Sequence, residues 1–259
     1  MDLGIAGRHA IVCASSRGLG FACADSLARE GVHVTINGRN AAALADAAGR
    51  LTERHAVTIT AVVGDITEQS TRDALLAACP MPDILVTNNG GPTPGRFADW
   101  DRDAWIAALD ANMLAPLALI RSTIDGMVER RFGRIVNITS AMVKTPLSPM
   151  GLSTGARTGL TSVAKALSKD VARANVTINN LLPERIDTER QRQMAELHAS
   201  TANISIDEAY KRMAMSIAAG RLGRPDEFGD ACAFLCSSQA GYISGQSVQL
   251  DGGSYAGLM

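Results

Sequence analysis

The residues with the clearest capacity for chemistry come directly after predicted strands. Gly18 and Gly20, in the segment "CASSRGLG" at 13–20, follow the run "HAIV" and open a predicted helix. Glycines here let the backbone approach a pyrophosphate closely, and the start of a helix offers N–H groups and a favourable dipole. The segment therefore predicts a dinucleotide phosphate site, formed by Ser15, Ser16, Arg17, Gly18, Leu19 and Gly20.

Two arginines would lie where such a cofactor presents its adenosine ribose. Arg17 is inside the glycine-rich segment, and Arg39 follows the next predicted strand in "TINGRN". Dinucleotide folds that select NAD usually carry an acidic residue at the end of this strand, whereas here Gly38 precedes a cation. Arginine forms bidentate bonds with phosphate, so the pair favours the 2′-phosphate of NADP(H). The alternative is that either arginine is a solvated surface charge.

A second group of candidate residues follows the predicted strand "RIVNITS", residues 134–140. Ser140 ends that strand, where the carboxyl end of a parallel strand meets the ligand crevice. Lys144 follows in the loop "SAMVKTP". A lysine removed from water beside another cation can have its pKa lowered toward neutrality and act as an acid. A solvated loop lysine fits the sequence equally well.

Asn112 lies within a long helical pattern at 104–131, and Pro116 comes four residues after it. Proline has no N–H to donate to the carbonyl group of Asn112. We therefore expect this carbonyl to be released from the helix ladder and free to hold water. A helix kink without catalytic purpose is the alternative.

The elements that would position these residues alternate regularly along the chain. Predicted strands cover residues 9–15, 33–38, 57–65, 83–91, 134–140, 176–183 and 247–253, and predicted helices cover 19–31, 41–54, 70–79, 104–131, 152–174 and 225–238. This alternation indicates right-handed crossovers and a parallel sheet covered on both faces. We predict an α/β fold, a single-domain Rossmann-type doubly wound parallel sheet spanning residues 1–259.

The segment from about residue 188 to 220 interrupts the alternation. It is polar and rich in Met, Gln, Arg and Ala. An insertion beside the carboxyl end of a strand often covers a ligand, so we expect a mobile substrate lid. Two ordinary surface helices are the alternative.

The composition limits the other classes of function. The chain has 259 residues, 46% of them hydrophobic, and a formal net charge of −1, which suits one large α/β domain. It has no run of eighteen apolar residues and no export leader, so we expect no membrane span and a cytoplasmic location. Scattered basic residues give no footprint for nucleic acid. The five cysteines lack metal-ligand spacing, so we expect reduced thiols and no metal.

Several motifs, in this order, resemble those of the short-chain dehydrogenase/reductase family. They are "SSRGLG" at 15–20, "GDI" at 64–66, "NNGG" at 88–91, "NITS" at 137–140 and "GRPDEF…AFLCS…YISGQSVQLDGG" at 223–253. The resemblance covers nearly the whole chain, and the most similar members are 3-oxoacyl-(acyl-carrier-protein) reductase-like. It implies an oxidoreductase that acts on a small carbonyl or alcohol substrate and assembles as a homo-oligomer, a dimer or homotetramer.

The resemblance also implies further contacts to the cofactor. Asp65 and Ile66 would flank the adenine. The segment Asn88, Asn89, Gly90 and Gly91 would stabilise the sheet beside the cofactor, and the nicotinamide would lie near Pro183, Ile186 and Thr188.

The resemblance fails at the catalytic pair. The family uses Asn, Ser, Tyr and Lys, and Asn112 and Ser140 match the first two. Where the family has its acid/base tyrosine the chain has Ser153, and where it has its lysine the chain has Arg157. An aliphatic hydroxyl is far less acidic than a phenol. An arginine, with a pKa above about 12, can hold ribose hydroxyls or favour an anion but cannot supply the proton.

The proton donor is therefore open at this stage. Lys144 is one candidate, and Glu184 in "LLPER" stands where the family usually has glycine. Glu184 could act as a base, bind a cationic group of the substrate or point at solvent. Tyr210 and His198 belong to the predicted lid, and of the chain's tyrosines only Tyr210 could swing over a substrate.

Taken together, these residues predict a divergent NADP-dependent oxidoreductase. It would transfer a hydride between nicotinamide and a carbonyl or alcohol, with a 3-oxoacyl thioester as the first substrate to test. Ser140, and with it Lys144, would polarise the carbonyl. The alternative is a catalytically impaired dinucleotide-binding protein of the same fold with a binding or regulatory role.

Overall fold

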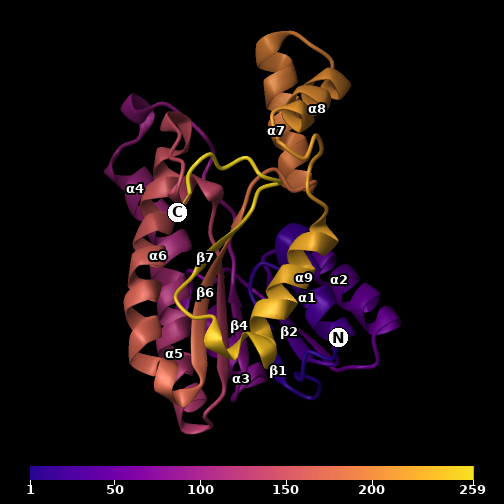
Figure 1. The fold of residues 1–259 in the computed structure, drawn as a ribbon, viewed down its shortest axis with the longest axis vertical. Helices are drawn as coiled ribbons and strands as arrows, with labels where there is room; N and C mark the ends of the chain where they lie inside the picture. The colour runs from indigo at the N-terminus through magenta and orange to yellow at the C-terminus, as the bar shows by residue number, and fades with distance from the viewer. Residues whose placement is uncertain (259) are drawn as a thin grey trace.

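The computed structural model describes residues 1–258, which are built around a seven-stranded sheet (Figure 1). The strand order is β3-β2-β1-β4-β5-β6-β7, and all neighbouring strands are parallel. The order reverses between β1 and β4, which creates a crevice at the carboxyl ends of these two strands. The strands are β1 His9–Val12, β2 His33–Gly38, β3 Ile59–Val63, β4 Ile84–Thr87, β5 Gly133–Ile138, β6 Val176–Pro183 and β7 Ser247–Leu250.

Helices cover both faces of the sheet, as the predicted fold class requires, and that prediction is confirmed. Figure 1 shows α1 and α9 on one side and α5 and α6 on the other. The two faces bury separate apolar clusters because successive strand residues point to opposite sides, Val12 to one cluster and Ile11 to the other. The helices are α1 Gly18–Arg29, α2 Ala41–Arg54, α3 Gln69–Ala78, α4 Arg102–Leu109, α5 Ala115–Glu129, α6 Gly151–Val171, α7 Glu189–Ala202, α8 Ile206–Met215 and α9 Pro225–Cys236.

The helical pattern at 104–131 is divided in the structure. Between α4 and α5 the chain makes a π-helical turn, Asp110–Leu114, in which the N–H of Ala115 donates to the carbonyl of Asp110, five residues back. Pro116 follows at the start of α5 and cannot donate to the usual partner four residues earlier, Asn112. The wide turn is where this defect in the helix ladder is absorbed. Asn112 therefore lies in an irregular stretch of backbone, as its relation to Pro116 predicted.

Among the described residues, the continuous run Arg102–Glu129 is long and apolar enough, by length and composition alone, to cross a membrane. In this structure the run packs against α6 and β5 on one face of the sheet. A core helix of a globular protein passes the same test.

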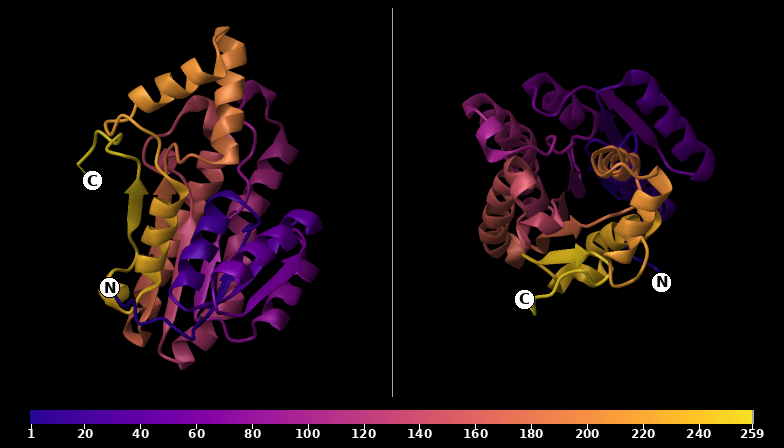
Figure 2. Two further views of the ribbon diagram at one scale, coloured as in Figure 1. Left: turned by 90° about the vertical axis from the view of Figure 1, so that its right-hand side faces the viewer. Right: turned by 90° about the horizontal axis from the view of Figure 1, so that it is seen from above.

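Helices α7 and α8 form a hairpin that stands above the carboxyl ends of the strands (Figure 2). The side chains of Thr188 and Ser205 cap the two helices by accepting N–H bonds from Gln191 and Glu208. A small apolar cluster, formed by Ala195, Ala199, Ala209 and Met213, holds the helices together. The segment predicted as a lid is thus a helical hairpin, and its mobility stays a prediction.

The five cysteines are free and buried. Burial raises the pKa of the Cys13 thiol to about 12 and that of Cys79 to about 11, so these thiols are neutral at physiological pH. Within residues 1–258, no cluster of three or more His, Cys, Asp or Glu side chains is placed to hold a metal ion.

Candidate active site

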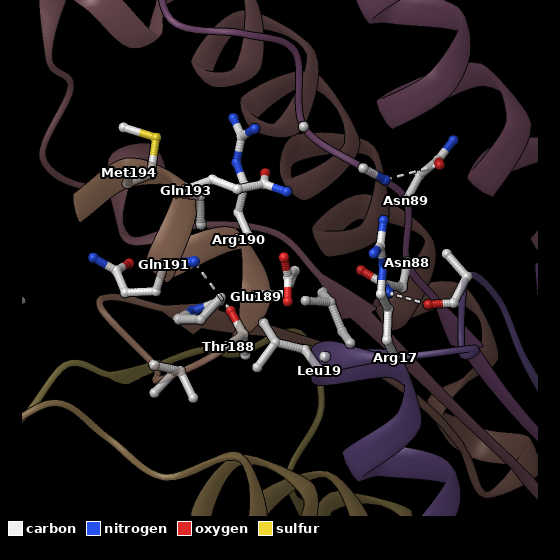
Figure 3. A pocket seen from close by; sticks show the side chains of 18 of the residues that line it. Arg17, Leu19, Asn88, Asn89, Thr188, Glu189, Arg190, Gln191, Gln193 and Met194 are labelled. Atoms are coloured by element: carbon white, nitrogen blue, oxygen red, sulfur yellow. Dashed lines mark hydrogen bonds between the residues drawn. The ribbon is translucent and has the colours of Figure 1, made fainter. Parts of the chain in front are cut away.

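A pocket of about 1020 Å³ lies at the carboxyl edge of the sheet, beneath α7 and α8. Its walls come from the loops that follow six of the strands and from the helical hairpin (Figure 3). It includes the crevice between β1 and β4 where the strand order reverses. An elongated site at this place is where doubly wound folds bind dinucleotides.

The phosphate end of the pocket is formed by the loop between β1 and α1. Ala14 adopts a left-handed backbone with φ of 44°, at the place where such loops usually have their first glycine. Helix α1 begins at Gly18, and the side chain of Arg17 makes no capping hydrogen bond to it. Across the pocket, a β-carbon at Gly18 would lie 4.0 Å from the side chain of Thr188. The start of α1 thus has no side-chain cap, and its N–H groups are available to a phosphate group, with Thr188 close to Gly18.

Two residues predicted to bind phosphate shape the loop instead. A β-carbon at Gly20 would lie 2.4 Å from the carbonyl oxygen of Ala14, so glycine is required for α1 to pack against the loop. Ser15 is fully buried, and its hydroxyl donates to the carbonyl of Val12 at 2.7 Å. The pocket wall itself includes Ser16, Arg17, Gly18 and Leu19.

Two cations line the pocket on neighbouring loops, Arg17 on the loop after β1 and Arg39 on the loop after β2. Asp65 lies 3.5 Å from Arg39; burial opposes its ionisation, but hydrogen bonds from Thr67 and the charge of Arg39 lower the pKa of its carboxyl group. A β-carbon at Gly38 would lie 3.2 Å from the Ser16 side chain, so a carboxylate side chain would crowd this place. The residues present therefore fit a phosphorylated ribose better than a free one.

The loop after β4 connects the two ends of the pocket. The side-chain amide of Asn88 donates to the carbonyl of Ala14, and that of Asn89 donates to the carbonyl of Ala111, both at 3.1 Å. These bonds fix the loop to the β1–α1 loop and to the π-helical turn. Gly90 and Gly91 line the pocket, as do Ile66, Pro183 and Ile186.

Ser140 stands at the end of β5 and lines the pocket beside Met142. Its side chain caps a short 3₁₀ turn, Ala141–Val143, by accepting the N–H of Met142 at 3.2 Å. This bond uses an acceptor site of the hydroxyl and leaves its O–H able to donate toward the pocket.

Asn112 does not line the large pocket. It borders a separate cavity of about 10 Å³, together with Asn89 and Pro116. A cavity of this size with polar walls holds about one water molecule. Its side-chain amide lies 3.4 Å from the carbonyl of Ala108 and 3.5 Å from that of Gly90. The predicted link between Asn112, Pro116 and a water position is thus compatible with the geometry.

Ser153 and Arg157 lie one turn apart on α6, and both face the loop at Gly91. A β-carbon at Gly91 would lie 3.6 Å from Nη2 of Arg157 and 4.0 Å from Oγ of Ser153. Arg157 lines the large pocket, whereas Ser153 is buried behind it.

Arg157 is a buried cation whose hydrogen-bond partners are neutral carbonyl groups. Its Nη1 donates to the carbonyls of Ile138 and Thr139 at the end of β5, and its Nη2 donates to Asn89 at 3.2 Å. Burial, and then the charge of Arg190, lower the pKa of Arg157 to about 10. The group is therefore more acidic than the sequence predicted, but it remains protonated at neutral pH.

The structure does not place Lys144 in the pocket wall. The 3₁₀ turn after Ser140 reverses the chain, and the Lys144 ammonium lies over the ring of Tyr255, 5.5 Å from its centroid. Tyr210 is also displaced from the pocket: it packs against the apolar cluster between α7 and α8, where burial raises its pKa. The position of Lys144 contradicts the expectation that it faces a substrate, whereas a swing of Tyr210 over a substrate stays a prediction.

Glu184 and His198 do line the pocket. Glu184 lies 3.6 Å from Nε of Arg185, a residue with a left-handed φ of 50°. The side chain of Glu184 is only 20% exposed and lines the pocket, which favours the two roles toward a substrate over pointing at solvent.

Of the pocket residues that α7 contributes, sequence reasoning named only His198. Arg190 and Met194, one helical turn apart, line the pocket together with Gln191, beside Thr188. Their helical spacing was readable from the sequence, but the direction of that face was not. Met142, Leu147 and Met150 complete an apolar wall opposite.

Comparisons with known proteins agree with this geometry. A family model described as "Enoyl-(Acyl carrier protein) reductase" matches residues 13–255. The chain is 30% identical to "NADPH-dependent reductase BacG" from Bacillus subtilis, over 95% of this chain and 97% of the relative. It is also 30% identical to "Dehydrogenase/reductase SDR family member 4" from Bos taurus, over 96% of this chain and 88% of the relative.

Among solved structures, L-sorbose reductase from Gluconobacter frateurii, complexed with NADPH and L-sorbose, superposes with a TM-score of 0.94. The two chains are 27% identical, and each is covered completely.

Proposed function

This chain belongs to the short-chain dehydrogenase/reductase family, and we propose that it reduces a carbonyl group with NADPH. The observation that carries the proposal is one pocket in which a phosphate site, two adenosine-end arginines and Ser140 are arranged in order along the sheet edge. Relatives that are NADPH-dependent reductases support the same reaction class.

NADP(H) is the cofactor that the pocket fits. The start of α1 would hold the pyrophosphate, and Arg17 and Arg39 would hold the 2′-phosphate. When bound, the nicotinamide supplies the hydride. Pro183 and Ile186 give that end of the pocket an apolar wall that excludes water.

Ser140 would orient the substrate by donating its O–H to the carbonyl oxygen. The same bond strengthens as negative charge develops on that oxygen, which lowers the barrier. The hydroxyl is preorganised for this task, because its bond from the Met142 N–H fixes the side chain at the end of β5.

Ser153 and Arg157 occupy the places of the family's tyrosine and lysine in the sequence pattern. Within the described residues no tyrosine or lysine lines the pocket, so we propose that a water molecule protonates the alkoxide and that the hydroxide left behind takes a proton from bulk solvent. The small cavity beside Asn112 has room for one such molecule. Arg157 would contribute its positive charge, which stabilises an alkoxide without proton transfer.

The test is consumption of NADPH across a panel of carbonyl compounds that includes 3-oxoacyl thioesters. We expect alcohol formation equal to NADPH consumed. Ser140→Ala should lower kcat roughly a hundredfold and leave the Kd for NADPH unchanged. Ser148→Ala, on an exposed turn near the site, is the matched control.

A second candidate function is a dinucleotide-binding protein with no turnover, and the identities of Ser153 and Arg157 favour it. Tight NADPH binding together with no reduction of any carbonyl compound would establish this candidate and rule out the reductase function.

We further propose that the protein acts in the cytoplasm as a dimer or tetramer. The exposed apolar side chains of Ile106 and Leu114, on the run from α4 to α5, support an interface between copies. Sedimentation velocity of the purified protein tests this, and a monomer would contradict it.

A further inference from the structure

The pocket carries more positive than negative side chains. Six arginines line it, but only three carboxylates do. The arginines are Arg17, Arg39, Arg157, Arg185, Arg190 and Arg212, and the carboxylates are Asp65, Glu184 and Glu189. Three of the arginines are neutralised in ion pairs, Arg39 with Asp65, Arg185 with Glu184 and Arg212 with Glu208. Within residues 1–258, Arg17, Arg157 and Arg190 form no ion pair, and a bound 2′-phosphate accounts for Arg17 alone.

The remaining two cations, Arg157 and Arg190, meet on one short loop. Nη2 of Arg157 donates to the carbonyl of Asn89, and Nη2 of Arg190 donates to the carbonyl of Pro92, each at 3.2 Å. Arg157 comes from α6 beneath the loop, and Arg190 comes from the first turn of α7 above the pocket. Two like charges are thus brought together against neutral acceptors, an arrangement that an anion between them would relieve.

Arg157 shows that the free protein leaves this charge incompletely satisfied. Its side chain is only 8% exposed, and among the described residues its Nε has no hydrogen-bond partner. The nearby positive charge of Arg190 makes its burial more costly, and the two together lower its pKa. A buried guanidinium without a carboxylate is costly unless another anion compensates it.

We propose that the substrate carries an anionic group, a carboxylate or a phosphate, close to its reacting carbonyl, and that Arg190 and Arg157 bind this group. The inference rests on the proposed reductase function and narrows its substrate to small anionic carbonyl compounds rather than neutral acyl thioesters. The opposite wall of Met142, Leu147 and Met150 would receive the apolar remainder of the substrate. Glu189, also at this end, would oppose a second anion and so limits the number of charges that can be bound.

The cofactor's phosphates do not account for Arg190 in this structure. In Figure 3 the Arg190 side chain points away from Leu19 and Thr188, which border the phosphate end, and toward the segment after Asn89. The guanidinium group of Arg190 therefore lies toward the substrate side of the pocket.

The experiment compares matched substrates with the NADPH-loaded protein. The pairs are 2-, 3- and 4-oxo acids with their methyl esters, and dihydroxyacetone phosphate with dihydroxyacetone. The variants are Arg190→Ala and Arg190→Lys, with Arg192→Ala as control, since Arg192 pairs with Glu196 at 3.4 Å and does not line the pocket. Arg157→Lys is the mildest change at the buried position.

We expect kcat/KM to favour the anionic member of at least one pair by roughly tenfold or more. Arg190→Ala should remove most of that ratio through KM, Arg190→Lys should keep part of it, and Arg192→Ala should keep all of it. The pair with the larger ratio identifies carboxylate or phosphate. Equal rates for charged and neutral partners, or thioesters as the best substrates, would overturn the inference while leaving the reductase intact.

Arg190→Ala could instead weaken NADPH binding and leave the ratio of kcat/KM between anionic and neutral substrates unchanged. That result would assign Arg190 to the cofactor and would also overturn the inference. If nothing is reduced, a binding experiment tests the anion site separately from the reaction. The shift in Tm of the NADPH-loaded protein measures whether benzoate binds better than benzamide. Benzoate binding that Arg190→Ala abolishes would support the anion site although the proposed function fails, and no binding of either compound would refute the site as well.

Discussion

The guanidinium of Arg39 lies 3.5 Å from the carboxylate of Asp65, at the outer end of the pocket. Arg39 is 74% exposed, so this ion pair is weak and the guanidinium can turn to a phosphate at little cost. The ion pair with Asp65 thus holds Arg39 at the adenosine end of the pocket.

Arg39→Ala should therefore lower the preference for NADPH over NADH roughly tenfold, equivalent to about 1.5 kcal/mol, the low end for a charge-assisted bond because the site is exposed. Fluorescence titration of both cofactors measures the change. Arg50→Ala is the control, because Arg50 lies on α2, the helix that follows Arg39, pairs with Asp46 and does not line the pocket. Equal Kd values for the two cofactors in the unaltered protein would show that the arginine pair has no such role.

Lys144→Met should retain turnover within about twofold. Its ammonium lies over the Tyr255 ring and outside the pocket wall, so no proton can pass directly from it to a substrate. Steady-state kcat and the Kd for NADPH are the measurements, with Lys169→Met on the exposed end of α6 as control. Loss of turnover with unchanged NADPH binding would return Lys144 to the mechanism.

Replacing the altered pair, by Ser153→Tyr with Arg157→Lys, should lower kcat/KM on the native substrate roughly tenfold or more. Ser153 is 4% exposed and faces Gly91, so a phenol there must extend into the substrate chamber. Lysine also cannot reproduce the fork with which Arg157 reaches the carbonyls of Thr139 and Asn89. The single variant Ser153→Tyr separates crowding from loss of the guanidinium. A large gain in carbonyl reduction would instead mark the protein as a decayed family member.

Acid should weaken the base of the α7–α8 hairpin through Glu227. This carboxylate accepts bonds from Arg221 and then from the backbone N–H of Arg224, and these lower its pKa to about 2. Because the folded pKa is below the ordinary value of 4.5, the stabilisation is present above about pH 4.5 and is lost as the pH falls toward 2.

Glu227→Gln should therefore lower Tm near neutral pH, and the difference from the unaltered protein should disappear at about pH 2. Thermal unfolding across this range is the measurement. Glu53→Gln on the exposed end of α2 should show no such convergence. A Tm difference that is constant with pH would mean that the charge of Glu227 does not contribute.

The fold and the cofactor end were predictable because they depend on local patterns. Short, mainly apolar runs such as 84–87 are typical of central strands, and the structure buries all four residues of this one. The alternation of such runs with helices indicates a parallel sheet. The β1–α1 loop then follows from its glycines, although the separate tasks of Gly18 and Gly20 depend on how closely α1 packs on Ala14.

The catalytic end was less predictable because it depends on the direction of side chains. Lys144 is four residues from Ser140, but a 3₁₀ turn between them sends the two side chains to different places. Arg190 was overlooked for the opposite reason: only the tertiary position of α7 brings it to the loop at Pro92. Neither turn geometry nor hairpin placement has a strong signature in a single sequence.

The apolar cluster that joins α7 to α8 shares no residue with the two clusters that flank the sheet. The hairpin and the sheet are therefore packed by separate apolar clusters, and the Asp187–Gly223 backbone bond joins the two segments that lead into and out of the hairpin. Substitutions on the pocket face of the hairpin change the side chains that a substrate would contact. They leave the apolar core of the sheet unchanged. In this protein the side chains that would contact a substrate can therefore be exchanged while the packing of the sheet that carries the cofactor end stays the same.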